Sequence, residues 1–242
     1  MRQWRGIWLR ELGACFLSPI AYAMLALYLL LGSWTFWHAV QSHVGRAESL
    51  PSLLVLSAAL WLPVLSALTT MRLFAEEKRQ GTLEILMTAP VTEWQVVLGK
   101  YAGALSFVLL AMAPLFGMFF ALCALAPAMP EPDVGALAGG ALILALLASY
   151  CVAVGLFFSL LTRNQIVAAV GGFGGMVLPA LGGHLLSYAP VGADRLIRLL
   201  AVEDHLMDFA RGALDAKPAF LYVSAAALLL FFSSRALMLR RM

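Results

Sequence analysis

A series of six long apolar runs constrains this chain more than any other feature of its sequence. Each run has about 18 or more residues, the length of α-helix that crosses the roughly 30 Å hydrocarbon core of a bilayer. The runs cover residues 19–38, 50–71, 97–126, 134–161, 166–187 and 218–234. The sequence therefore predicts an all-α membrane protein, with six transmembrane helices in a single domain over residues 1–242.

The composition excludes an ordinary soluble domain. Of 242 residues, 62% are hydrophobic and 12% charged, against about 45–50% and about 25% in soluble domains. A net charge of +3 is too small to indicate a nucleic-acid partner. The three cysteines, Cys15, Cys123 and Cys151, lie in or beside apolar runs without C-x-x-C spacing, so we predict neither disulfide bonds nor a metal site.

The amino-terminal segment, residues 1–16, places Trp4, Ile7 and Trp8 among arginines. This amphipathic pattern predicts an elbow helix that lies in the membrane interface. Ser18 followed by Pro19 is typical of a helix start, so the first span is expected to begin sharply. The first run has no convincing signal-peptidase site, and we expect it to be retained as a span.

The basic residues predict the orientation. Eleven of the sixteen lysines and arginines fall at the two termini, in the loop after the second apolar run and in the loop after the fourth. By the positive-inside rule, both termini are expected to be cytoplasmic.

Charged side chains flank the apolar runs. We assign Lys100, at the start of the third run, to the preceding loop, and therefore predict no Asp, Glu, Lys or Arg at membrane depth. Proton relays and ion sites need such residues, which disfavours a gradient-driven carrier. The sequence has no phosphate-binding loop, H-E-x-x-H or G-x-S-x-G motif. We predict a non-catalytic protein without a bound cofactor, powered by another chain or by a gradient.

The second loop carries the most informative pattern. Two acids and two bases precede Gly81 and Thr82, a pair expected to break one helix and cap the next, after which apolar residues recur at i, i+3 and i+4 until Pro90. This pattern predicts a short cytoplasmic helix with one apolar stripe, although a solvated loop whose stripe rests on the membrane remains an alternative. Thr92 and Gln95 then form a predicted capping box, with Val91 and Val96 as a hydrophobic staple.

Three stretches resemble type-2 ABC transporter permeases, particularly the gliding-motility and copper-maturation-like branch. They are the run M-R-L-F-A-E-E-K-R-Q-G-T-L-E-I-L-M-T-A-P at residues 71–90, S-P-I-A-Y at 18–22 and H-L-M-D-F-A-R-G-A-L-D at 205–215. The resemblance implies a half-transporter that pairs with a second, identical or different, permease subunit and with two ABC ATPase subunits. The partner ATPase would bind ATP and Mg.

The resemblance also implies that residues 76–90 form the coupling helix that enters a groove of the ATPase. An apolar stripe flanked by charge is suited to such a groove. The residues carried onto this role are Glu76, Glu77, Lys78, Arg79, Gly81, Thr82, Leu83, Glu84, Leu86, Met87 and Pro90.

Glycines mark two further candidate regions. Gly171 and Gly175 form a G-x-x-x-G motif in the fifth run, before Pro179. This run either packs within the chain or lines the interface between permease subunits and bends to open the path. Gly99 and Gly103 repeat the spacing in the third run, where we expect ordinary packing.

The last outer loop, residues 191–215, interleaves apolar and charged residues and predicts short helices. The resemblance implies external gate helices that include Phe209, with a polar cluster of His205, Arg211 and Asp215 that closes the exit. The alternative is a cap that satisfies its own hydrogen bonds.

The predicted function is a substrate-translocating ABC permease, acting as an exporter in a bacterial inner membrane. An alternative is an ATPase-linked envelope machine, such as one for gliding motility, that transmits force without moving a solute. The substrate cannot be read from the sequence, because the spans offer no complementary charge.

Overall fold

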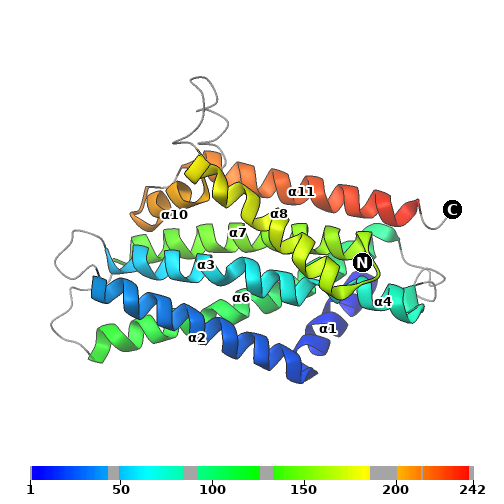
Figure 1. The fold of residues 1–242 in the computed structure, drawn as a ribbon, viewed down its shortest axis with the longest axis horizontal. Coiled ribbons are helices and arrows are strands. Elements are labelled where there is room, and N and C mark those ends of the chain that lie inside the picture. Colours follow the sequence, from blue (N-terminus) through cyan, green and yellow to red (C-terminus); the bar gives the residue numbers. More distant parts are fainter. Residues whose placement is uncertain are drawn as a thin grey trace.

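The computed structural model describes residues 2–42, 49–83, 92–125, 133–185, 201–213 and 215–239, whose regular structure is all α-helix. Five long helices and a sixth apolar helix, α8, run side by side, with short helices at both ends (Figure 1). The helices are α1 (Arg2–Leu17), α2 (Pro19–Ser42), α3 (Leu50–Thr70), α4 (Ala75–Gln80), α6 (Glu93–Leu125), α7 (Val134–Leu161), α8 (Gln165–Leu185), α10 (Val202–Ala210) and α11 (Ala216–Met238).

Five of the six predicted spans are confirmed as helices long and apolar enough to cross a membrane. They are α2, α3 together with the α4 that continues it, α6, α7 and α11. The described apolar part of α8 covers Gln165–Pro179 and is shorter than a span, so the sixth span stays a prediction. The molecule is an α-helical, multi-pass membrane protein.

Helix α7 lies at the centre and packs against α3, α8, α10 and α11. Two of its glycines allow α3 to come close. A Cβ atom added to Gly140 would collide with Cγ2 of Val55, and one added to Gly155 would collide with Oγ1 of Thr70. Such close backbone contact is a main source of helix association in lipid.

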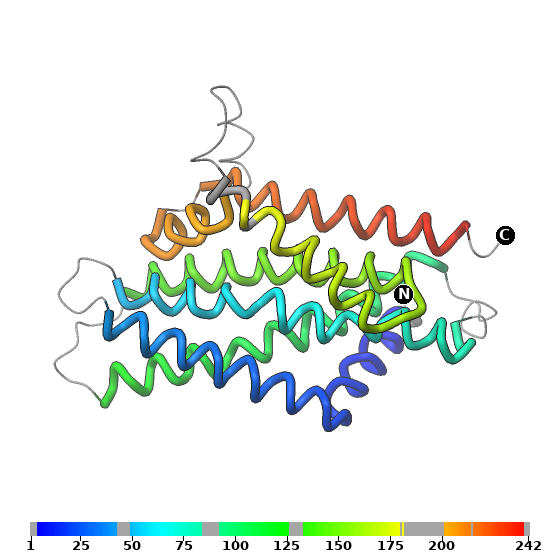
Figure 2. Tube along the Cα trace, in the orientation of Figure 1, coloured from blue at the N-terminus to red at the C-terminus, as the bar shows by residue number. Residues whose placement is uncertain are grey.

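Helix α1 forms a sharp bend with α2 at Ser18 and crosses the end of the bundle near α4 (Figure 2). Helix α1 covers nearly the same residues as the predicted elbow helix, and α2 begins at Pro19 as expected. Whether α1 lies in the membrane interface stays a prediction.

Local capping explains where several helices start. The predicted capping box is confirmed, because Thr92 N donates to Oε1 of Gln95 (3.2 Å) and Gln95 N donates to Oγ1 of Thr92 (3.4 Å). Val91, of the predicted staple, lies outside the described residues. Asp133 caps α7 by accepting bonds from the N–H groups of Gly135 and Ala136, which the sequence analysis missed.

Candidate functional site

The candidate site lies where α3 ends and the second loop begins. Residues 71–74 form a turn, and α4 follows with Glu76 and Glu77 in its first turn and Lys78 and Arg79 in its last. This order suits the helix dipole. Gly81 ends the helix with φ of 73°, a left-handed conformation that glycine adopts without strain. The helix break predicted at Gly81 is therefore confirmed.

Ser159, in the last turn of α7, holds this turn in place. Its fully buried hydroxyl accepts bonds from Phe74 N and Ala75 N, both at 3.1 Å, and donates to Met71 O at 3.2 Å. Lys78 Nζ also donates to the carbonyl of Leu160. The start of α4 is thus fixed to the end of α7.

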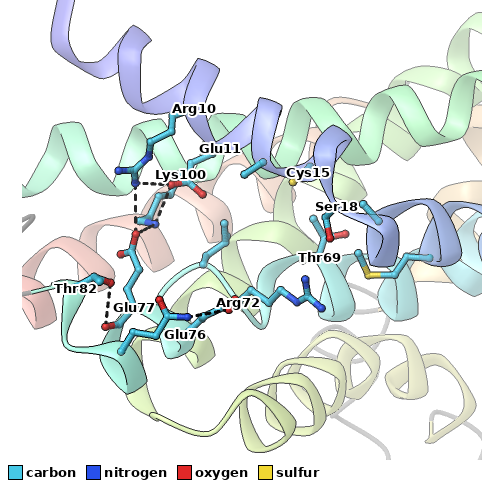
Figure 3. Close-up of a pocket in the computed structure, with 15 residues that line it drawn as sticks. Arg10, Glu11, Cys15, Ser18, Thr69, Arg72, Glu76, Glu77, Thr82 and Lys100 are labelled. Carbon is cyan, nitrogen blue, oxygen red and sulfur yellow. Dashed lines mark hydrogen bonds and ion pairs between the residues drawn. The ribbon is translucent and has the colours of Figure 1, made fainter.

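Lys100 joins α4 to two other helices. Its Nζ atom lies 2.8 Å from Oε1 of Glu77 and 3.1 Å from Oε1 of Glu11, which belongs to α1. Arg10 adds contacts of 2.8 Å to Glu11 and 3.4 Å to Glu77 (Figure 3). We call these four residues the Lys100 cluster.

The burial of Lys100 corrects the sequence analysis. Its side chain is 1% exposed and lies two turns inside α6, so the assignment of Lys100 to the preceding loop is wrong, while the absence of charge at membrane depth stays a prediction. An unpaired ammonium at such a site is costly, but two carboxylates from distant parts of the chain neutralise it. The signal available in the sequence was a lysine inside an apolar run, which requires an acidic partner.

The ionisation of Glu11 and Arg10 keeps the Lys100 cluster charged. Burial by itself raises the pKa of Glu11, but Lys100 and Arg10 more than offset it and hold that pKa below its ordinary value. The hydrogen bond to Glu11 raises the pKa of Arg10. The carboxylate and the guanidinium are therefore both ionised at neutral pH.

Two glycines in α6 allow α1 to lie close to α6 at the Lys100 cluster. A Cβ atom added to Gly99 would fall 2.8 Å from Ile7, and one added to Gly103 would fall 2.7 Å from Cβ of Glu11. Trp8 Nε1 also donates to Oγ of Ser106 at 3.1 Å. The ordinary packing expected of Gly99 and Gly103 is confirmed, and its partner is α1.

Only part of the predicted coupling helix is described. Arg79, Gly81 and Thr82 are exposed, whereas Leu83 is buried and packs in the chain's own core. Glu84, Leu86, Met87 and Pro90 lie outside the described residues. The contact of this segment with an ATPase stays a prediction.

Gly171 and Gly175 of α8 face α7. Added Cβ atoms at Gly171 and Gly175 would fall 2.8 Å and 2.9 Å from the ring of Phe158. These contacts favour the packing alternative for the G-x-x-x-G motif. Pro179 lies inside the same helix, and its role in a path stays a prediction.

The residues predicted for the external gate lie on α10 and at the start of α11. His205 Nδ1 lies 3.4 Å from the hydroxyl of Tyr222, and Asp215 caps α11 by accepting a bond from Lys217 N. Phe209 is buried and Arg211 is exposed at the end of α10. Burial lowers the pKa of His205 although aspartates nearby oppose it. The Asp215 cap agrees with the alternative that this segment satisfies its own hydrogen bonds. A role as a gate stays a prediction.

An apolar cavity of about 470 Å³ lies in the half of the molecule near α10. Helices α2, α3, α7, α8 and α10 all contribute to its lining, through residues such as Leu60, Cys151 and Met176. Glu203 is the charged residue in this lining. The cavity can hold an apolar group of small-ligand size.

The long apolar helices define a multi-pass, α-helical membrane protein. Residues 15–198 match the family model described as ABC-2 family transporter protein, which covers about three quarters of the chain. The chain therefore belongs to this family, as the membrane permease component of an ABC-2 type transporter. The family implies ATPase partner subunits. A sequence comparison with curated proteins gave no match.

Proposed function

We propose that this permease couples ATP hydrolysis by its partner subunits to the export of a substrate, and that residues 76–90 receive the ATPase. The supporting observation is the way α4 is held. Its start is bonded to α7 through Ser159, and Glu77 is paired with Lys100 of α6 and lies beside α1. Its far end, at Arg79–Thr82, is exposed.

This arrangement suits the transmission of force. A push on the exposed end of α4 reaches α7 through Ser159, and α6 and α1 through the Lys100 cluster. Packed elements of this kind move as units between discrete arrangements. ATP-driven closure of the partner would in this way shift α1, α6 and α7 together.

The proposed assembly has two permease subunits and two ATPases in a bacterial inner membrane. Each permease has six spans, with α8 as the fifth in chain order, and both termini in the cytoplasm beside α4. The concentration of basic residues at the termini and in the α4 region supports this orientation. We place the chain in the gliding-motility and copper-maturation-like branch on the three resembling stretches alone.

The apolar cavity beside α10 is the proposed part of the path within one subunit. Its lining supports a cargo that presents an apolar group rather than a charged one. It lies toward the end of the bundle away from α4, where an exporter releases its cargo.

Co-purification tests the coupling assignment. A tagged chain should retain its ATPase, and Leu86→Asp with Met87→Asp should lose it, because charge cannot enter an apolar groove. Lys217→Asp, at an exposed site at the other end of the molecule, is the matched control and should retain it. Retention of the ATPase by the double variant, with normal ATP-dependent activity, would show that the segment is not the docking site.

A further inference from the structure

A second pocket lies beside two junctions between helices. One joins α1 to α2, and the other joins α3 to α4. The pocket is open, has a volume of about 810 Å³, and takes in parts of α6 as well (Figure 3). The spans α2 and α3 begin and end here, at Pro19 and Thr70. The pocket therefore lies at the depth where a helix leaves the hydrocarbon core and meets lipid headgroups.

The pocket has an apolar part and a polar part. Ala21 and Met24, in the first turns of α2, line the apolar part, and Ser18 and Thr69 add hydroxyl groups. Charged side chains from α1, α4 and α6 line the rest. An amphipathic pocket at headgroup depth is suited to an amphipathic ligand.

Arg72 supplies a group that lacks a partner. Its Nε atom is buried and has no hydrogen-bond acceptor among the described residues. The neighbouring carboxylates each use Oε1 elsewhere, since Glu11 and Glu77 bind Lys100 and Glu76 accepts a bond from Gln80 through that atom, and Oε2 of Glu77 is likewise buried without a partner among the described residues. A buried donor without an acceptor is unfavourable, and the planar guanidinium fits a phosphate with two parallel bonds.

The charges of the pocket favour a ligand without net charge. Three cations, Arg10, Arg72 and Lys100, and three carboxylates, Glu11, Glu76 and Glu77, line it. A purely anionic ligand would leave this balanced set with a net negative charge. A zwitterion would keep the balance, with its phosphate on Arg72 and its ammonium on Glu76.

We propose that this pocket binds a zwitterionic phospholipid of the phosphatidylethanolamine class. The acyl chain would lie against Ala21 and Met24, and the headgroup would bridge Arg72 and Glu76. The lipid would then contact both the elbow helix α1 and the coupling segment. The proposal does not depend on the ATPase assignment, because lipid binding is measured without nucleotide.

Native mass spectrometry of the purified full chain, with any subunits that accompany it, tests the proposal by titration with phosphatidylethanolamine. Arg72→Gln should weaken binding by about tenfold, the range of one charge-assisted contact. Arg163→Gln removes an exposed arginine just after α7, outside the lining of the pocket, and should bind as the wild type does. Phosphatidylglycerol should bind more weakly than phosphatidylethanolamine, and Glu76→Gln should reduce that preference.

Equal binding by Arg72→Gln and the wild type would overturn the proposal. Displacement of the lipid by inorganic phosphate at equal concentration would overturn it too, because it would identify a site for a free anion. If Arg72→Gln fails to fold, Ala14→Trp provides a second test. Ala14 is exposed and lines the pocket, so this change fills the space and keeps every charge. Full lipid binding by Ala14→Trp would contradict the proposal.

Discussion

The two ends of the helix bundle are held together by different forces. At the α4 end, ion pairs and hydrogen bonds join four helices around Lys100 and Ser159. At the α10 end, the described contacts include helix caps, the exposed Asp215–Lys217 ion pair, the His205–Tyr222 pair and apolar packing around a cavity. Buried charge pairs fix geometry, whereas apolar surfaces tolerate rearrangement. The difference suits a protein that is pushed at one end and opens at the other.

The largest effect is expected from Lys100→Met, which breaks the α4 end alone. Removing the ammonium leaves the carboxylates of Glu11 and Glu77 together and only partly solvated, at a cost of about 3–5 kcal/mol. Thermal unfolding in detergent measures the loss. The triple variant Lys100→Met, Glu11→Gln, Glu77→Gln removes the uncompensated charge and should recover much of the stability. An unchanged melting temperature for Lys100→Met would remove the Lys100 cluster from the account.

Ser159→Ala tests the second connection at the α4 end. It leaves the N–H groups of Phe74 and Ala75 without their acceptor, at a cost of about 2–3 kcal/mol. Amide exchange at residues 74 and 75 should become faster. The matched control is Ser233→Ala, because Ser233 is equally buried but bonds only within its own helix, to Leu229 O. Equal destabilisation by the two variants would contradict the special role of Ser159.

Gly103→Ala tests whether α1 belongs to this end. The added methyl group meets Cβ of Glu11 at 2.7 Å and should push α1 away from α6, at a cost of about 1–3 kcal/mol. Protease access to residues 2–17 reports the displacement. Gly117→Ala, in the same helix but with nothing within 4 Å, should not increase access. Protection of α1 in both variants would show that its docking does not depend on the glycine.

The smallest expected effect is that of acid, which should lower the local stability of the α10 end but not that of the α4 end. Because burial lowers the pKa of His205 in the folded state, the unfolded state takes up its proton first, and stability is lost as pH falls below about 6.5. Glu11 has a lowered pKa, so its contribution persists until the pH falls below about 4. Between pH 7.5 and 5, amide exchange corrected for intrinsic rate should increase around α10 and not around α1.

The expected loss at the α10 end is below about 1 kcal/mol, because His205 is only half buried. His205→Gln should abolish the pH response. A stronger acid response around α1 than around α10 would reverse the comparison.

Local patterns were predictable from the sequence, and long-range pairing was not. The Thr92–Gln95 box and the helix break at Gly81 depend on residues a few positions apart. The Lys100–Glu11 pair joins residues 89 positions apart, and Ser159 meets Phe74 across 85. Which surfaces meet depends on how the helices pack. The same holds for Leu83. Periodicity predicted that it belongs to an apolar stripe, but not that the chain's own core covers its side chain.

The central claim is that force enters at the exposed end of α4. Site-specific photo-cross-linking tests it most directly, with a photoreactive residue at Thr82 or, for comparison, at Lys217 near the opposite end, both of which are exposed. We expect a cross-link from position 82 to the ATPase subunit and none from position 217. A cross-link from position 217, with none from position 82, would contradict it.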